Sequence, residues 1–263
     1  MQLPRKAIGF KCIEIFYIDQ NAIAFILRRF CQLFACRPIN LIIYSTSDRI
    51  LELIFCNIWP MIGKNICGMA LFAGVFQHLR KLAPSILNDC PSLRFVSFNF
   101  DEFIPEFPAD DSSAASDGQT VAKWLFTPRP DNVPKVLKCW LQLNDGNLAS
   151  RIEAFKSAFV LASSPSNCIV SVWFPRSFVE SVVPFNLTNE LTREQLALKR
   201  INNSRRFLFV LFPIARDESK WTKWEEEVID WEFIDQWNQI DIQITNERQI
   251  GDRLLKAMFS RSE

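Results

Sequence analysis

Apolar residues recur along the chain in triplets, in which one apolar residue is followed by others three and five positions later. The six triplets are Phe10/Ile13/Ile15, Ile39/Ile42/Tyr44, Ile66/Met69/Leu71, Leu93/Val96/Phe98, Val136/Cys139/Leu141 and Ile169/Val172/Phe174. They end at positions 15, 44, 71, 98, 141 and 174, so successive ends are 29, 27, 27, 43 and 33 residues apart. An L-x-x-L-x-L pattern at this period is typical of a leucine-rich-repeat-like solenoid, with one strand and one helix in each repeat.

Segments with helical periodicity separate the expected strands. They are residues 20–35, a segment capped by Ser47-Asp48, residues 75–88 with a bend at Pro84, a segment opened by the capping box of Ser116 and Gln119, and the segment of Ile152, Phe155 and Phe159. Alternating strands and helices predict an α/β fold with parallel strands joined by right-handed crossovers. A doubly wound sheet has the same alternation, and the regular period favours the solenoid.

The pattern changes after about residue 178. Residues 194–201 and 205–212 read as two strands around an Asn-Asn-Ser turn, which predicts a hairpin. Residues 218–231 follow as a helix, and Ile240, Ile242 and Ile244 alternate as a strand. We therefore expect a C-terminal antiparallel α+β (ββαβ) unit that caps the solenoid.

These patterns divide the chain into three expected parts. Residues 1–178 form the leucine-rich-repeat-like solenoid, 179–248 the C-terminal α+β unit, and 249–263 a tail. The long 43-residue step is explained by an insertion at 101–117, which is rich in Pro, Ser, Ala and Asp. We expect this insertion to be a solvated, mobile loop.

Composition narrows the range of functions. The net charge of +1 provides no field that would attract nucleic acid or an anionic membrane. No signal peptide is apparent, and no apolar run reaches the roughly 20 residues of a membrane span. The eight cysteines contain no Cys-x-x-Cys pair, so we expect mostly reduced thiols and an intracellular protein, in the cytoplasm or the nucleus.

The sequence contains few of the residues and motifs that enzymes commonly use for catalysis. His78 is the one histidine, and we expect it on the surface of a helix. No Gly-x-Ser-x-Gly, phosphate-loop or Gly-x-Gly-x-x-Gly motif occurs, so we expect no cofactor, no metal site and no enzyme activity. The alternative is a doubly wound α/β hydrolase or transferase that uses carboxylates such as Asp101 and Asp110, with a pocket at the strand C-termini.

A solenoid more often supplies a binding surface, and its concave face is the expected place. Strand alternation directs the residues between the apolar positions to that face. The partner-binding candidates among them are Phe16, Phe72, Asn99, Trp140, Gln142 and Trp173. Two alternatives stay open: the C-terminal unit could cover this face, or the assumed repeat register could be wrong. The tryptophans at 221, 224 and 231 have helical spacing and are expected in the core.

Several motifs resemble a known family. They are residues 58–60 with 66–67, 88–94, 107–111, 122–125 with 127–129, 189–192, and above all 213–221 with 224–225, where Arg216-Asp217-x-x-Lys220-Trp221 is the most specific part. Over residues 8–252 the chain resembles the expanded F-box-associated protein family of plant-parasitic nematodes.

The resemblance implies a function. Members of this family are understood as substrate receptors of cullin-type ubiquitin ligases, in which an N-terminal F-box docks on the ligase adaptor and the repeat region selects the target. Only nine residues precede the first triplet here, so we expect the F-box to be missing. The ligase adaptor is then a partner only if a longer form carries an F-box. The expected function is non-enzymatic recognition of a protein target that is still unknown.

Overall fold

The computed structural model describes residues 9–45, 47–102, 105–141 and 148–251. The chain separates into two compact units. The first unit comprises Met1–Leu93 and Phe233–Glu263, and the second comprises Arg94–Glu232. These bounds differ from the expected division at residues 178 and 248, because the chain returns to the first unit after residue 232.

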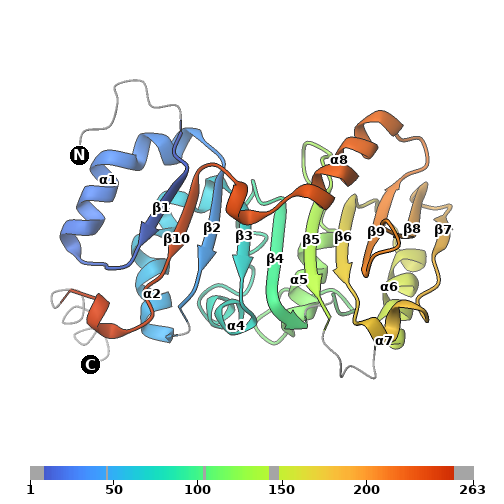
Figure 1. The fold of residues 1–263 in the computed structure, drawn as a ribbon, viewed down its shortest axis with the longest axis horizontal. Helices are drawn as coiled ribbons and strands as arrows, with labels where there is room; N and C mark the ends of the chain where they lie inside the picture. The colour runs from blue at the N-terminus through green and yellow to red at the C-terminus, as the bar shows by residue number, and fades with distance from the viewer. Residues whose placement is uncertain (1–8, 46, 103–104, 142–147, 252–263) are drawn as a thin grey trace. The chain divides into compact units, whose positions relative to one another are not determined.

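The first unit is an α/β structure with a parallel sheet (Figure 1). Its strands are β1 (Cys12–Ile15), β2 (Ile39–Ile43), β3 (Ile66–Leu71) and β10 (Gln239–Ile242), and its helices are α1 (Gln20–Cys36), α2 (Asp48–Asn57), α3 (Trp59–Ile62) and α4 (Ala73–Leu82), with short 3₁₀ turns η1 (Gly63–Asn65), η2 (Phe233–Asp235) and η3 (Glu247–Gln249). The strand order is β1-β10-β2-β3, and every pair is parallel.

One face of this sheet is entirely apolar. The strand register places the following side chains on it: Ile13 and Ile15, Ile240 and Ile242, Leu41 and Ile43, and Met69 and Leu71. Helices α2 and α4 contact each other and lie behind the strands in Figure 1. They contribute buried residues such as Ile50, Leu51, Val75 and Phe76. Each such buried side chain contributes roughly 1.5–3 kcal/mol of hydrophobic free energy, so this layer is the core of the unit.

Strand β10 corrects the expected C-terminal cap. Its alternating isoleucines form a strand as predicted, but the strand is parallel and lies between β1 and β2, so it is not part of an antiparallel unit. The physical reason is burial, since all four residues of β10 are buried. A strand buried on both faces fits the interior of a parallel sheet. The alternation predicted the strand and carried no information about its neighbours.

The predicted helices of this unit form, with one change. The Asp19 carboxylate caps α1 by accepting a hydrogen bond from the Ala22 amide at 2.6 Å. Helix α4 ends at Leu82, so it does not continue through Pro84 with a bend as expected. Proline disfavours a helical conformation of the residue before it, which explains the earlier end.

The second unit is a mixed α/β structure. Its strands are β4 (Phe95–Glu102), β5 (Lys135–Trp140), β6 (Cys168–Trp173), β7 (Phe185–Asn189), β8 (Glu194–Arg200) and β9 (Arg206–Pro213), and its helices are α5 (Asp117–Phe126), α6 (Leu148–Leu161), α7 (Arg176–Val179) and α8 (Glu218–Asp230). The order is β4-β5-β6-β9-β8-β7. Strands β4 to β6 are parallel, and β9, β8 and β7 are antiparallel to their neighbours.

Helices cover both faces of this second sheet. Helices α5 and α6 lie behind the strands in Figure 1, and α8 lies in front. The expected hairpin of β8 and β9 is confirmed, with Arg200 opposite Phe207 and Glu194 opposite Pro213. Its turn residues Asn202 and Asn203 both have positive φ, at 46° and 52°. Asparagine tolerates this conformation better than most residues, so the turn explains why the sequence carries two of them.

The expected loop insertion at 101–117 is packed near its start and exposed in its middle. Residues 101 and 102 belong to β4, and residues 103–104 lie outside the described residues. Pro105 is buried, and the Phe107 ring meets those of Phe126 at 5.2 Å and Phe155 at 5.8 Å between centroids. The capping box of Ser116 and Gln119 is confirmed at the start of α5. Because Phe107 anchors the segment to α5 and α6, the prediction of a solvated loop is wrong at this residue, whereas Ser112, Ser113 and Ala114 are exposed as expected.

Candidate interaction surfaces

Two tryptophans of the second unit form a stacked pair. Trp140 ends β5 and Trp173 ends β6, and the two residues are direct partners in the parallel register. Their rings are stacked, with centroids 4.9 Å apart and planes at 4°. Trp140 is 42% exposed, and Trp173 is partly buried. The Arg206 guanidinium lies 5.9 Å from the centroid of the Trp173 ring. This arrangement holds the pair rigidly at the C-terminal end of two parallel strands.

A polar row lies on the same face, one step toward the strand N-termini. Lys138 on β5 and Ser171 on β6 are register partners in this row, and Arg206 on β9, the register partner of Trp173, reaches it from the tryptophan row. Arg206 Nε donates to Ser171 Oγ at 2.8 Å, and its two terminal nitrogens donate to the carbonyls of Val228 and Ile229 at 2.7 and 2.6 Å. Since these carbonyls belong to the last turn of α8, Arg206 satisfies groups that a helix end leaves without intrahelical partners.

Lys138 holds the same helix end. Its ammonium donates to the Trp231 carbonyl, and the Trp231 ring stacks on Phe95 with centroids 4.4 Å apart. Burial, reinforced by the nearby charge of Arg206, lowers the pKa of Lys138 to about 8. Helix α8 therefore covers this face of the second sheet as far as Lys138 and leaves Trp140 exposed. The alternative that the C-terminal part covers the expected binding face holds for part of the face only.

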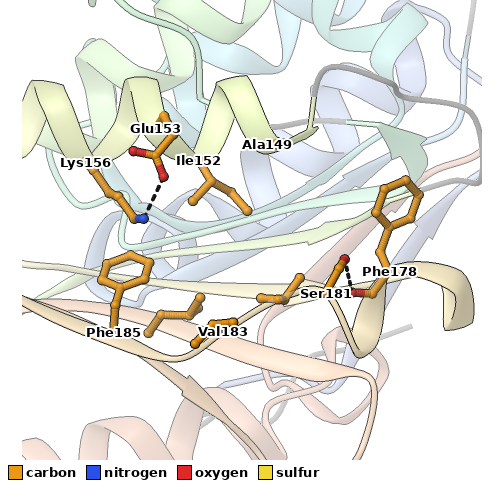
Figure 2. Close-up of a pocket in the computed structure, with 10 residues that line it drawn as sticks. Ala149, Ile152, Glu153, Lys156, Phe178, Ser181, Val183 and Phe185 are labelled. Carbon is orange, nitrogen blue, oxygen red and sulfur yellow. Dashed lines mark hydrogen bonds and ion pairs between the residues drawn. The ribbon is translucent and has the colours of Figure 1, made fainter.

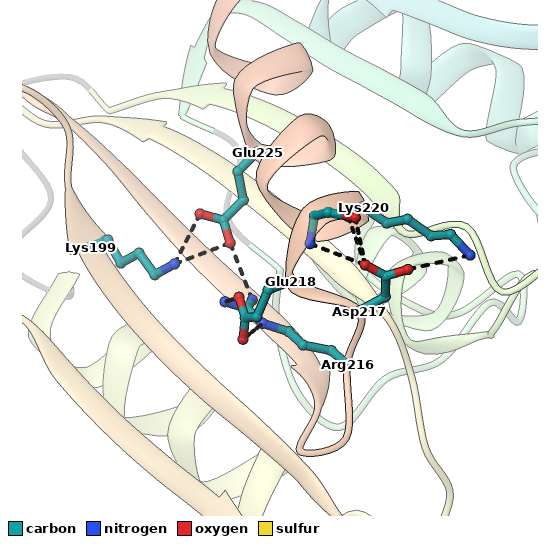
Figure 3. A network of polar contacts seen from close by, with 7 residues as sticks. Lys199, Arg216, Asp217, Glu218, Lys220 and Glu225 are labelled. Atoms are coloured by element: carbon teal, nitrogen blue, oxygen red, sulfur yellow. Dashed lines mark hydrogen bonds and ion pairs between the residues drawn. The ribbon is translucent and has the colours of Figure 1, made fainter.

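The tryptophans of α8 itself are largely core residues, as predicted. Trp221 and Trp231 are buried, and Trp224 is partly buried. Figure 3 shows the polar network where α8 begins. Glu225 accepts from Lys199 at 2.9 Å and from Arg216 at 3.3 Å, and the Arg216 guanidinium lies 3.9 Å from the Phe212 ring centroid. The motif at 216–221 thus joins the start of α8 to the β8–β9 hairpin.

The first unit contains the other two aromatic candidates that the structure describes. Phe16 follows β1 and is 48% exposed, and Phe72 follows β3 and is partly buried. Phe72 contacts Tyr44, which follows β2, with ring centroids 5.8 Å apart. Tyr44 is exposed and was expected to point inward, so the assumed register is wrong by one residue in β2. The inward residues are Leu41 and Ile43, since they pair with Ile240 and Ile242.

The structure does not describe the side chains of the two remaining partner-binding candidates, so their positions are not tested. Asn99 belongs to β4, and its side chain lies outside the described residues, as does Gln142 as a whole. Phe16 and Phe72 belong to the first unit, whereas Trp140 and Trp173 belong to the second. We therefore treat them as two separate surfaces.

Of the residues considered for catalysis, the structure describes the side-chain surroundings of His78 and Asp110. His78 is partly buried on α4, beside Asp48, and its Nδ1 lies 3.2 Å from Lys81 Nζ. Asp110 accepts hydrogen bonds from the side chain and the backbone of Ser112, which lower its pKa. The side chain of Asp101 lies outside the described residues. Within the described ranges, no cluster of three or more His, Cys, Asp or Glu side chains is arranged to hold a metal ion.

The second unit also has an apolar cavity of about 300 Å³ between α6 and the segment that leads into β7 (Figure 2). Its lining includes Ile152, Phe178, Val183 and Phe185. At its edge the Lys156 ammonium donates to Glu153 at 2.7 Å and lies 4.3 Å from the Phe185 ring centroid. This cavity could not be predicted from the sequence pattern, because β7 was not predicted.

Comparison with known proteins adds little. No protein-family model matches the chain, and no curated protein matches it. Among solved structures, the chain is similar to a chitinase from Chromobacterium violaceum ATCC 12472, with a TM-score of 0.22 and 11% sequence identity over 96% of this chain and 89% of the chitinase chain. A likeness this low carries no argument about fold or activity. In the described part of the chain, no helix is both long enough and apolar enough to cross a membrane.

Proposed function

We propose that this protein is a non-enzymatic recognition module that binds a protein target through the Trp140–Trp173 pair. The observation that carries the proposal is the stacking of the exposed Trp140 ring on the partly buried Trp173 ring. Tryptophan provides a large contact area and loses little conformational entropy on binding, and it is enriched at the energetic centres of interfaces. The pair is held by the strands and by Arg206 before any partner arrives, which reduces the ordering cost of association.

The proposal includes the finer architecture that the sequence suggests. We propose that the strand–helix units repeat in the manner of a leucine-rich-repeat-like solenoid, with the target on the face that carries the tryptophan pair. The resemblance to F-box-associated proteins suggests that the module selects targets for a cullin-type ubiquitin ligase. In that case the ligase adaptor binds only a longer form that carries an F-box.

Site-specific photo-crosslinking tests the proposal. p-Benzoylphenylalanine replaces Trp140 in one variant and Lys223 in the control, because Lys223 is an exposed residue of α8 in the same unit. Both proteins are irradiated in an extract of the source organism, and the products are identified by mass spectrometry. We expect one protein to be cross-linked from position 140 and not from position 223, and to bind the unmodified chain after purification. Equal products at both positions, or no product from position 140, contradict the proposal.

A further inference from the structure

The second face of the first unit's sheet differs sharply from its apolar core face. The strand register gives this face the side chains of Cys12 and Glu14 on β1, Gln239 and Asp241 on β10, Asn40 and Ile42 on β2, and Gly68 and Ala70 on β3. Tyr44 and Phe72 follow β2 and β3 at its C-terminal end. We call the part formed by Glu14, Asp241, Tyr44, Phe72 and Phe16 the acidic–aromatic face.

Two carboxylates stand side by side on this face. Glu14 and Asp241 are register partners on neighbouring parallel strands. Such strands are about 4.8 Å apart, and like charges directly opposite each other destabilise a sheet. Glu14 is exposed, whereas Asp241 is 7% exposed and accepts a hydrogen bond from Gln239 Nε2 at 2.7 Å. Burial, and then the charge of Glu14, raise the pKa of Asp241.

The described strand residues supply no counter-charge. None of the side chains that the register assigns to this face is Lys or Arg, and the described residues form no ion pair with Glu14 or Asp241. Among the described residues, this face therefore holds two neighbouring acids without a paired cation, and Glu14 is the exposed one of the two. A positively charged partner would remove this repulsion when it binds.

Aromatic rings flank the two acids. Tyr44 is 39% exposed, Phe16 is 48% exposed, and Phe72 contacts Tyr44. The Tyr44 hydroxyl stays protonated, because burial and the charges of Asp241, Cys12 and Glu14 raise its pKa. A guanidinium suits such a surface, because it pairs with a carboxylate through two hydrogen bonds and stacks on an aromatic ring at the same time.

We propose that the acidic–aromatic face binds an arginine-containing segment of a partner protein. The arginine side chain pairs with Glu14 and Asp241, and an apolar residue beside it packs on Tyr44 and Phe72. This is a second contact surface in addition to the recognition function proposed above, and it does not involve the tryptophan pair.

Fluorescence anisotropy with a defined probe tests the inference. The probe is a fluorescein-labelled octapeptide of alternating arginine and leucine, and the control probe has glutamate at each arginine position. We expect the full chain to bind the arginine probe and not the glutamate probe. Glu14→Gln and Asp241→Asn should each weaken binding about tenfold, in line with the loss of one charged pair. Raising the salt concentration should also weaken it.

The matched control is Glu52→Gln, which removes an exposed carboxylate from α2 in the same unit. Its affinity should equal that of the unsubstituted protein. Equal binding by Glu14→Gln, or binding of the glutamate probe, overturns the inference. Thermal unfolding of each variant shows whether a weaker signal comes from misfolding, and the retained Tm of Glu14→Gln keeps the test valid.

Other occupants of this face give different results. If the probe binds only after Arg253, Lys256 and Arg261 are all replaced by Gln in the full chain, the face is occupied by the chain's own C-terminal segment and the inference is wrong. If sedimentation shows a dimer that Glu14→Gln dissociates, a second copy is the occupant and the inference is again wrong. Cross-linking at position 140 does not depend on any of these binding or sedimentation experiments. The recognition proposal and this inference can therefore fail separately.

Discussion

Arg206 of β9 donates a hydrogen bond to the main-chain carbonyl of Val228, with its nitrogen 2.7 Å from the oxygen. The same guanidinium also bonds to Ile229 and Ser171, so one side chain connects the end of α8 to two strands. Its charge is opposite in sign to the dipole at a helix C-terminus, which strengthens the contact. This residue therefore fixes how far α8 covers the face on which Trp140 and Trp173 lie.

Replacing Arg206 by Ala should lower the free energy of unfolding by about 3 kcal/mol. Removing the guanidinium leaves two helix-end carbonyls and a buried hydroxyl without hydrogen-bond partners. Each such group costs roughly 1–3 kcal/mol when no water replaces the lost partner. Arg205→Ala is the control, since this neighbouring side chain is exposed. Urea unfolding measures both variants. Equal stability of the two would show that Arg206 does not hold α8.

Two buried lysines should make stability depend on alkaline pH. Burial lowers the pKa of Lys135 and of Lys138 to about 8. Between pH 8 and about 10.4, the usual lysine pKa, the unfolded chain binds a proton that the folded chain has lost, so the free energy of unfolding rises with pH. Each lysine contributes roughly 2 kcal/mol to this rise.

The lysine prediction is tested by comparing the protein with Lys135→Met and Lys138→Met variants from pH 7 to 10. The comparison cancels the opposite trend of the buried thiols, which ionise in the unfolded chain first. In each variant, the free energy of unfolding should lack the part of the increase with pH that the replaced lysine contributes. A constant difference between protein and variant across this range contradicts the lowered pKa values.

Exposed cysteines should differ in reactivity. Cys12 and Cys56 are both exposed, but burial of its sulfur and the charges of Asp241 and Glu14 raise the pKa of Cys12 to about 11. The thiolate is the reactive form, so Cys12 should react several times more slowly than Cys56 with iodoacetamide at pH 8. Peptide mass spectrometry follows each site. Cys90 and Cys139, whose pKa values burial raises to about 12, should react only after unfolding. Faster labelling of Cys12 than of Cys56 would disprove the proposed electrostatics.

Asp241→Asn should raise Tm at pH 7. Because the pKa of Asp241 is raised, the folded state disfavours its charge, and this penalty is present once pH exceeds the folded pKa. Asparagine keeps an oxygen that can accept from Gln239. The difference in Tm between Asp241→Asn and the unsubstituted protein should shrink as pH falls. It should vanish below about pH 3.9, where the aspartate is protonated in both the folded and the unfolded state. Scanning calorimetry against Glu52→Gln measures it, and a lower Tm at pH 7 would refute the repulsion between Glu14 and Asp241.

The sequence predicted the local elements well. All six triplets fall on or beside observed strands, the capping box at Ser116 opens α5, and the two asparagines form the expected hairpin turn. These features depend on residues near one another in the chain. The periodicity of apolar residues therefore predicted the α/β class and the parallel pairing of β2 with β3, of β4 with β5 and of β5 with β6.

The sequence did not predict long-range neighbours. Strand β10 pairs with β1 and β2 across more than 190 residues, and no local pattern specifies such a partner. The register in β2 was missed because Leu41, Ile42 and Ile43 are all buried, so alternation gives no direction there. As a result Tyr44 was taken for a core residue. The pairing of Glu14 with Asp241 was missed for the same reason, because it depends on the position of β10.

The most direct test of the recognition proposal is calorimetric titration with the protein that cross-links to position 140. The unsubstituted chain, the double variant Trp140→Ala/Trp173→Ala and the control Trp237→Ala are compared; Trp237 is 65% exposed and lies in the other unit. We predict at least about a hundredfold loss of affinity for the double variant, since hot-spot residues contribute 2 kcal/mol or more. Its Tm should stay within a few degrees of the unsubstituted protein, and Trp237→Ala should bind normally. Unchanged affinity of a folded double variant, or its failure to fold, would contradict the assignment of the tryptophan pair as the target-binding surface.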